Sequence, residues 1–152
     1  MPQINNNCIV TLESRQIMLG DEEVTSISVP AAKTKRNGKT YISYTVYYDD
    51  AEEWENKEIL KIVSGECIEL IRQGFLKAKM VFKKGETTVC DYTSPAGKMI
   101  LSVDTLDLVI KDIPELTQID LKYKIELDSD AEILVYFKFT AQHGELNEKG
   151  SI

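Results

Sequence analysis

Apolar side chains occupy every second position in one segment of the chain after another. Residues 42–48 alternate in this way, and so do residues 119–127 and 133–141. A period of two places successive side chains on opposite faces of a strand, so each segment is expected to bury one face. This pattern is typical of antiparallel sheets, in which one face packs on a core and the other meets solvent.

About ten strands are predicted, and short turn signals separate them. They fall near residues 8–17, 23–30, 39–48, 58–64, 67–72, 76–83, 86–92, 98–110, 119–127 and 132–142. Asn37-Gly38 is the clearest hairpin turn, because a type I′ turn needs positive φ at both central residues. The best candidate for a helix is residues 49–60, with one or two turns. Strands spaced this evenly indicate a sandwich or a barrel.

The phase of the apolar positions changes inside one predicted strand. Met99 and Leu101 occupy odd positions, whereas Leu106 and Leu108 occupy even ones. A strand can bury both sets only through a bulge, a bend or a break, which is expected near residues 104–105. Such irregularities let a sheet curl and close.

The size and charge of the chain limit its class. Its 152 residues and net charge of −7 describe one acidic domain, expected to span residues 1–152 with flexible tails at 1–7 and 143–152. Because binding to nucleic acid requires a basic surface, a nucleic-acid partner is not expected. Two local groups of basic residues are interpreted as solvated outer faces: Lys33, Lys35, Arg36 and Lys39, and Lys77, Lys79, Lys83 and Lys84.

The chain shows no signal-peptide pattern at its start and no apolar run that approaches the roughly 18 residues of a membrane span. Cys8, Cys67 and Cys90 are odd in number and widely spaced, which predicts free, buried thiols in a reducing compartment. A cytoplasmic location without a membrane span is therefore expected.

No catalytic, cofactor or metal motif stands out. His143 is the only histidine and is interpreted as an exposed residue, so neither a zinc site nor a histidine base is expected. The acidic residues between 49 and 58, which include Glu58, lack the spacing of an EF-hand loop and are interpreted as a solvated connection. Trp54, within them, is expected to pack over a barrel mouth, with a surface staple as the alternative.

Polar groups on apolar faces are the candidate binding residues. Arg72 continues the face of Ile68 and Leu70, and a buried guanidinium must be paired. It could hold the carboxylate or phosphate of a ligand, or it could bond loop carbonyls or an internal acid and plug the barrel end. Tyr44, Tyr92 and Tyr123 also fall on inward faces, where they either define a ligand cavity or serve as large core residues.

Several short motifs, in order, resemble the YwiB-like family of small uncharacterised bacterial proteins. They are the segments 37–44, Arg72-x-Gly74, 80–85, Tyr92-Thr93-Ser94-Pro95-x-Gly97 and Val103-x-Thr105, followed by the strand around Tyr123. The resemblance covers about residues 37–127. It implies an all-β fold, a single closed antiparallel β-barrel of lipocalin or calycin type, and no known activity. With the alternation above, we expect about 8–10 strands and at most one short helix.

Two functions follow from a barrel with these inward groups. The first is non-enzymatic binding of a small apolar or amphipathic molecule inside the barrel by Arg72, Tyr44, Tyr92 and Tyr123. The second is a packed barrel that serves as a protein-interaction module or homodimer, with Tyr41, Tyr47 and Tyr136 on outward faces. An enzyme with an unusual carboxylate or tyrosine site is a third, less favoured reading. An open interior would favour the first function, and a packed interior with an apolar outer surface would favour the second.

Overall fold

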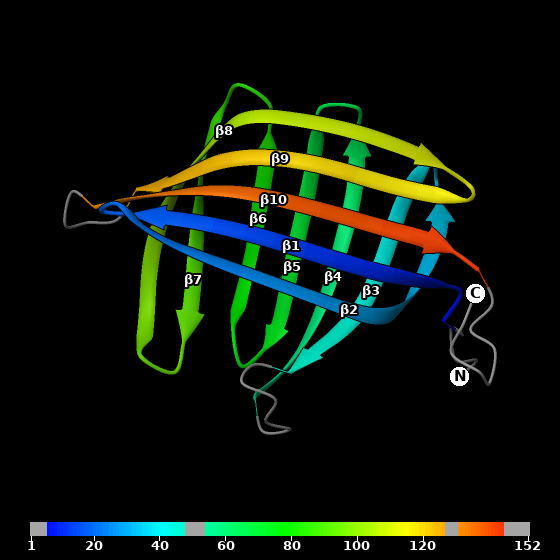
Figure 1. Cartoon of the computed structure of the whole chain (residues 1–152), viewed down its shortest axis with the longest axis horizontal. Helices are drawn as coiled ribbons and strands as arrows, with labels where there is room; N and C mark the ends of the chain where they lie inside the picture. Colours follow the sequence, from blue (N-terminus) through cyan, green and yellow to red (C-terminus); the bar gives the residue numbers. More distant parts are fainter. Residues whose placement is uncertain (1–5, 48–53, 127–130, 145–152) are drawn as a thin grey trace.

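Ten antiparallel strands form a closed barrel (Figure 1). The computed structural model describes residues 6–47, 54–126 and 131–144. The strands are β1 (Cys8–Met18), β2 (Asp21–Arg36), β3 (Lys39–Tyr47), β4 (Glu55–Ser64), β5 (Cys67–Gly74), β6 (Lys77–Lys83), β7 (Thr87–Ser94), β8 (Gly97–Ile113), β9 (Leu116–Glu126) and β10 (Glu132–His143). Each strand pairs with its neighbours in sequence, and β1 pairs with β10 to close the ring. The predicted fold class is confirmed.

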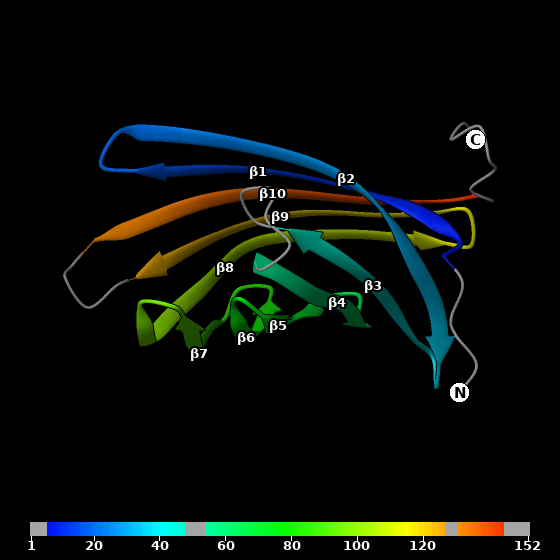
Figure 2. The same cartoon turned by 90° about the horizontal axis from the view of Figure 1, so that it is seen from below.

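The barrel is flattened into two layers whose strands cross steeply. β1, β10 and β9 form one layer and β3 to β7 the other, as the views in Figures 1 and 2 show. The two longest strands belong to both layers. β2 pairs with β1 over residues 21–31 and with β3 over residues 31–36, while β8 pairs with β7 over residues 97–104 and with β9 over residues 102–113. These two strands therefore make the corners of the barrel.

The predicted irregularity in β8 is present. The register with β9 shifts between Thr105 and Asp107, which leaves Leu106 without a partner. Leu101, Val103, Thr105 and Leu108 are buried. The expectation that Met99 and Leu106 also face the core is wrong, since they are 45% and 43% exposed. The bulge leaves Leu106 outside and lets Thr105 take the inward position before it.

Apolar side chains fill the interior. Each alternating segment was expected to bury the face that carries its apolar residues: Ile42, Tyr44 and Val46, then Leu121 and Tyr123, then Val135 and Phe137. All of these are buried except Phe137, which is only half-buried. The Phe82 ring lies 4.7 Å from that of Tyr123, and the Tyr44 ring lies 6.1 Å from that of Phe139. Burying one such side chain contributes about 1.5–3 kcal/mol, so this packing is the main source of stability.

The Asn37-Gly38 turn is confirmed, with φ of 53° and 77°. Two expectations about strand limits are wrong. β2 continues past Pro30 to Arg36, and residues 55–60 form strand rather than helix, while residues 49–53 lie outside the described part. A proline is tolerated in a strand where its missing N–H has no partner strand, which is the situation of Pro30 on β2. In the part of the chain that the structure describes, no helix is long and apolar enough to cross a bilayer.

Candidate functional site

A row of polar side chains runs across one layer of the barrel. Strand pairing makes Tyr44, Glu58, Arg72, Ala78 and Tyr92 successive partners on β3, β4, β5, β6 and β7. Directly opposite residues in an antiparallel sheet share a face, so these side chains are neighbours. We call these five residues the polar row. Three of the four predicted site residues lie on it.

Glu58 is the internal partner of Arg72. Its Oε2 lies 3.8 Å from the Arg72 Nε, and the two side chains are 4% and 19% exposed. The Asn56 amide donates to the same Oε2 at 3.4 Å, and its own carbonyl oxygen accepts from the Leu76 N–H at 2.7 Å. The carboxylate that Arg72 needs is thus supplied by the protein, as the structural reading of Arg72 expected.

The interpretation of Glu58 as part of a solvated loop is wrong. Glu58 is buried in β4, on the same face as Leu60 and Ile62. The period of two already placed these three residues together, and Asn56 with them. The run of acids before Glu58 is typical of a solvated loop, but the period of two continues through Glu58.

Tyr123 reaches the polar row from β9. Burial raises the pKa of its hydroxyl to about 12, while the charge of Arg72 lowers that pKa and Tyr92 raises it by smaller amounts. Electrostatic coupling of this kind requires that the groups lie near one another. The structure therefore brings Tyr123 near Arg72 and Tyr92, whereas Tyr44 stands at the opposite end of the polar row from Tyr92.

The polar row passes from the core towards the surface. Tyr44 and Glu58 are buried, Arg72 and Tyr92 are half-buried, and Met99, the partner of Tyr92 on β8, is exposed. Ala78 lies between Arg72 and Tyr92 and carries only a methyl group. Ala78 therefore has the shortest side chain of the polar row, and it lies between the guanidinium of Arg72 and the phenol of Tyr92.

An aromatic stack lies beside the Arg72 end of β5. Trp54 packs on Phe75, with ring centroids 5.2 Å apart and planes at 28°. Both side chains are half-buried, and this contact fits a lid over a barrel mouth and a surface staple equally. Gly74 makes the turn possible: its φ is 141°, and a side chain there would collide with the carbonyl oxygen of Glu55. The Phe75 N–H donates to that same oxygen at 3.0 Å.

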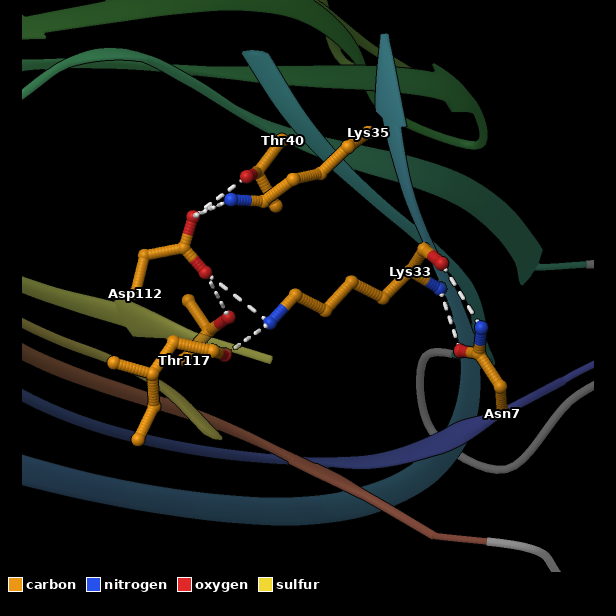
Figure 3. A network of polar contacts seen from close by, with 7 residues as sticks. Asn7, Lys33, Lys35, Thr40, Asp112 and Thr117 are labelled. Carbon is orange, nitrogen blue, oxygen red and sulfur yellow. Dashed lines mark hydrogen bonds and ion pairs between the residues drawn. The ribbon is translucent and has the colours of Figure 1, made fainter. Parts of the chain in front are cut away.

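A second polar cluster joins the two layers around Asp112 (Figure 3). The carboxylate accepts hydrogen bonds from Thr40 at 2.6 Å and Thr117 at 2.8 Å, and its Oδ1 lies 3.1 Å from the Lys33 Nζ. Lys33 also donates to the carbonyl of Ile113 at 2.8 Å, and its backbone is held by the Asn7 side chain. Strands β2 and β3 are thereby tied to β8 and β9.

The interpretation of Lys33 as a solvated residue is wrong. Its side chain is 7% exposed, whereas that of Lys35, which lies 3.9 Å from the same carboxylate, is 58% exposed. Burial alone would raise the pKa of Asp112. The hydrogen bonds from Thr40, Thr117 and Lys33 and the charge of Lys33 outweigh burial and hold this pKa below its usual value. Each side chain in this cluster bonds another residue of the chain, so the cluster holds the corner strands of the barrel together.

The remaining chemical groups are placed as follows. Cys8 and Cys90 are buried and Cys67 is half-buried, and all three are free, as predicted. Burial raises the pKa of each thiol, which keeps it protonated at neutral pH. His143 is exposed, but it is the last residue of β10, and its N–H donates to Glu115. Among the described residues, no group of His, Cys, Asp and Glu side chains is placed to hold a metal ion.

Two open hollows of about 490 Å³ lie on the barrel. One follows the outside of β1, β10 and β9, where the Tyr136 ring lies between Arg15 and Lys122. The other is lined by residues that include Pro30, Ala32, Tyr44 and Glu58, beside the bend in β2. The second hollow meets the buried end of the polar row.

Comparison with known proteins identifies the family. A family model described as "Domain of unknown function (DUF1934)" matches residues 10–136. The chain belongs to the DUF1934 family. Its barrel is similar to the crystal structure of the YwiB protein from Bacillus subtilis, with a TM-score of 0.81 and 21% identity over 92% of this chain and 93% of that one.

This likeness confirms the resemblance to YwiB and the fold of the DUF1934 barrel. A structure of unknown function from Bacteroides ovatus aligns with 95% of this chain and 43% of that one at 12% identity, but its TM-score of 0.38 is too low to carry an argument. No curated protein matches the sequence.

Proposed function

We propose that this DUF1934 barrel binds a small amphipathic molecule beside Ala78, without catalysing a reaction. One observation supports the proposal: Arg72 and Tyr92 flank Ala78 on the polar row, and Tyr123 lies near both, where an otherwise apolar interior approaches the surface, while Tyr44 stands at the buried end of the row. Binding sites are typically apolar surfaces with a few convergent polar groups that fix orientation.

The packing limits the size of the ligand. Behind the polar row the interior is filled by Leu70, Met80, Phe82 and Phe139, and this packing favours the interaction module over a ligand deep inside the barrel. The proposed ligand is therefore confined to the half-buried part of the row between Arg72 and Tyr92. A long acyl chain has no room there, so the ligand proposed is one ring or a short aliphatic group beside Ala78, whose methyl group is the smallest side chain of the row. The aromatic stack of Trp54 on Phe75 supplies an apolar wall near the same strand end.

The charges limit the head group. An anionic head would compete with Glu58 for Arg72 and weaken a buried ion pair, which opposes its binding. A cationic head would compete with Arg72 for Glu58 in the same way. An uncharged head with both a donor and an acceptor, such as an amide, can bond the guanidinium and a tyrosine hydroxyl while the ion pair stays intact.

The same proposal places the protein in a reducing compartment, as expected for the cytoplasm. Its support is that Cys8, Cys67 and Cys90 are free.

The test is a series of probes with one ring and different heads: benzamide, benzoate and benzylamine, measured by ligand-detected NMR. We expect saturation transfer to benzamide and little to the two charged probes. Ala78→Leu should abolish the benzamide signal by filling the space. Lys79→Leu is the matched control, because Lys79 is exposed on the opposite face of the same strand.

Three results would contradict the proposal. They are preference for a charged probe, equal signals with Ala78→Leu and Lys79→Leu, and no binding by the natural protein. The last result, together with a large loss of stability in Arg72→Met, would mark Arg72 as a structural plug.

A further inference from the structure

The first half of β2 lies at an open edge. Residues 21–30 pair with β1 alone among the described strands, whereas residues 31–36 pair with β3. Side chains on both faces of residues 21–28 are exposed, with Val24 at 65% and Ile27 at 38%. Figure 2 shows this half of β2 and its partner β1 extending along the margin of their layer.

The hairpin turns determine which backbone groups this edge presents. Arg36 and Lys39 flank the two-residue turn Asn37-Gly38, so they form a hydrogen-bonded pair. Bonding direction alternates along a strand, and even-numbered residues of β2 therefore point their N–H and C=O groups to the β3 side. At Glu22, Val24, Ser26 and Ser28 that side has no described strand. Pairing with β3 begins at Ala31, so Pro30, which has no N–H, lies just before the paired segment.

Most of this edge lacks protection against pairing. Natural sheets guard their edges with charges, prolines or bulges. Residues 24–29 read Val-Thr-Ser-Ile-Ser-Val and contain none of these. The acids Asp21, Glu22 and Glu23 stand at one end only, and Glu22 is already paired with Arg15 at 3.0 Å. A strand of β-branched and small residues with exposed hydrogen-bonding groups is suited to receive another strand.

We propose that β2 pairs antiparallel with β2 of a second copy of this chain, about a two-fold axis at Thr25. This register places Glu22 opposite Ser28 of the partner subunit and Val24 opposite Ser26 of the partner subunit. It uses all four even residues of the edge. An axis at Val24 or Ser26 leaves at least one of them facing a turn or Pro30.

Charge supports a second copy as the occupant. Antiparallel pairing about Thr25 sends the two acidic ends in opposite directions, so that each faces an uncharged segment of the other subunit. Identical surfaces related by a two-fold axis are the commonest form of protein dimer. The interface lies on β2, away from Ala78, so it is independent of the proposed ligand site.

The test exploits the position of Thr25 on the axis. Like charges directly opposite each other oppose strand pairing. Native mass spectrometry and light scattering should give twice the monomer mass for the natural protein, and the monomer mass for Thr25→Lys and for Thr25→Glu alone. An equimolar mixture of the two variants should restore a dimer that contains one of each. Thr25 is exposed, so neither charge disturbs the core.

A matched pair at Ser26 tests the backbone. Ser26→Pro removes an N–H on the open edge and should give a monomer, whereas Ser26→Ala keeps that N–H and should stay dimeric. Circular dichroism checks that both variants are folded. A natural protein that is monomeric at 200 μM overturns the proposal, and so does a dimer that Ser26→Pro leaves intact. A dimer that the charge mixture fails to restore overturns the axis at Thr25.

Discussion

Replacing Lys33 by methionine tests how the barrel is closed. The substitution keeps most of the length of the side chain and removes its charge from a site that is 7% exposed. Asp112 then keeps its hydrogen bonds from Thr40 and Thr117 but loses the ammonium at 3.1 Å. Breaking a buried ion pair by removing one partner costs about 3–5 kcal/mol. Because the hydroxyl groups of Thr40 and Thr117 still donate to Asp112, we expect the cost of Lys33→Met to fall at the lower end of this range, at about 3 kcal/mol.

The assay is equilibrium unfolding in urea, followed by the fluorescence of Trp54, the single tryptophan. With a typical m-value of about 2 kcal/mol per molar, a loss of about 3 kcal/mol lowers the midpoint by about 1.5 M. Lys35→Met is the matched control, because Lys35 lies 3.9 Å from the same carboxylate but is 58% exposed. A pair at the surface contributes about 0–1 kcal/mol, so this variant should unfold close to the natural protein.

The dependence on pH gives a second readout. The pKa of Asp112 is lowered by folding, so its contribution is present above the unfolded value of 3.8 and is lost as the pH falls through the lower, folded value. Lys33→Met removes the part of the lowering of the Asp112 pKa that the Lys33 ammonium causes. The difference in stability between natural protein and Lys33→Met should therefore be large near neutral pH and narrow in acid. Equal losses in Lys33→Met and Lys35→Met, or a difference that stays constant into acid, would refute the reasoning.

Three further predictions concern the polar row and its turn. The pKa of Tyr123 is about 12 in the folded protein and 10.0 in the unfolded chain, so the natural protein should lose on the order of 2–3 kcal/mol of stability between pH 10 and pH 12. Tyr123→Phe has no hydroxyl to deprotonate and should not show this loss. Unfolding free energies that fall equally with alkaline pH in both proteins would contradict this. Glu58→Gln should destabilise the protein in urea by about 3 kcal/mol, since it removes the buried carboxylate that is paired with the Arg72 guanidinium, and Glu69→Gln on the outer face should cost less than about 1 kcal/mol. Gly74→Ala should lower the melting temperature and shift the emission of Trp54, because the added methyl group meets the Glu55 carbonyl; Gly20→Ala, which meets no atom, should leave that emission unchanged.

The alternation of apolar residues predicted strands, faces and most of the core, because a sheet with one buried face repeats its side-chain pattern every two residues. It also predicted the irregularity in β8. It could not predict that Thr105 would face inward while Leu106 stayed outside, since the apolar pattern alone does not say which residue a bulge expels. The bend of β2 at the barrel corner depends on its pairing with β1 over residues 21–31 and with β3 over residues 31–36, and the alternation within β2 does not show where one partner gives way to the other.

The positions of the polar side chains in the barrel were predicted in part. Arg72 and the three tyrosines were found because polar groups on apolar faces break the expected pattern. Glu58 and Lys33 obey the same rule, yet each sits within a run of like charges that suggested a solvated surface. The partner of Lys33 is Asp112, more than half the chain away, and only the closed barrel brings the two together.

Native mass spectrometry of the protein purified from its own host tests the central claim most directly. If the polar row binds a small molecule beside Ala78, the natural protein should carry an added mass that is lost on denaturation, and Ala78→Leu should carry none. A natural protein without any added mass, or an added mass that Ala78→Leu retains, would contradict the account.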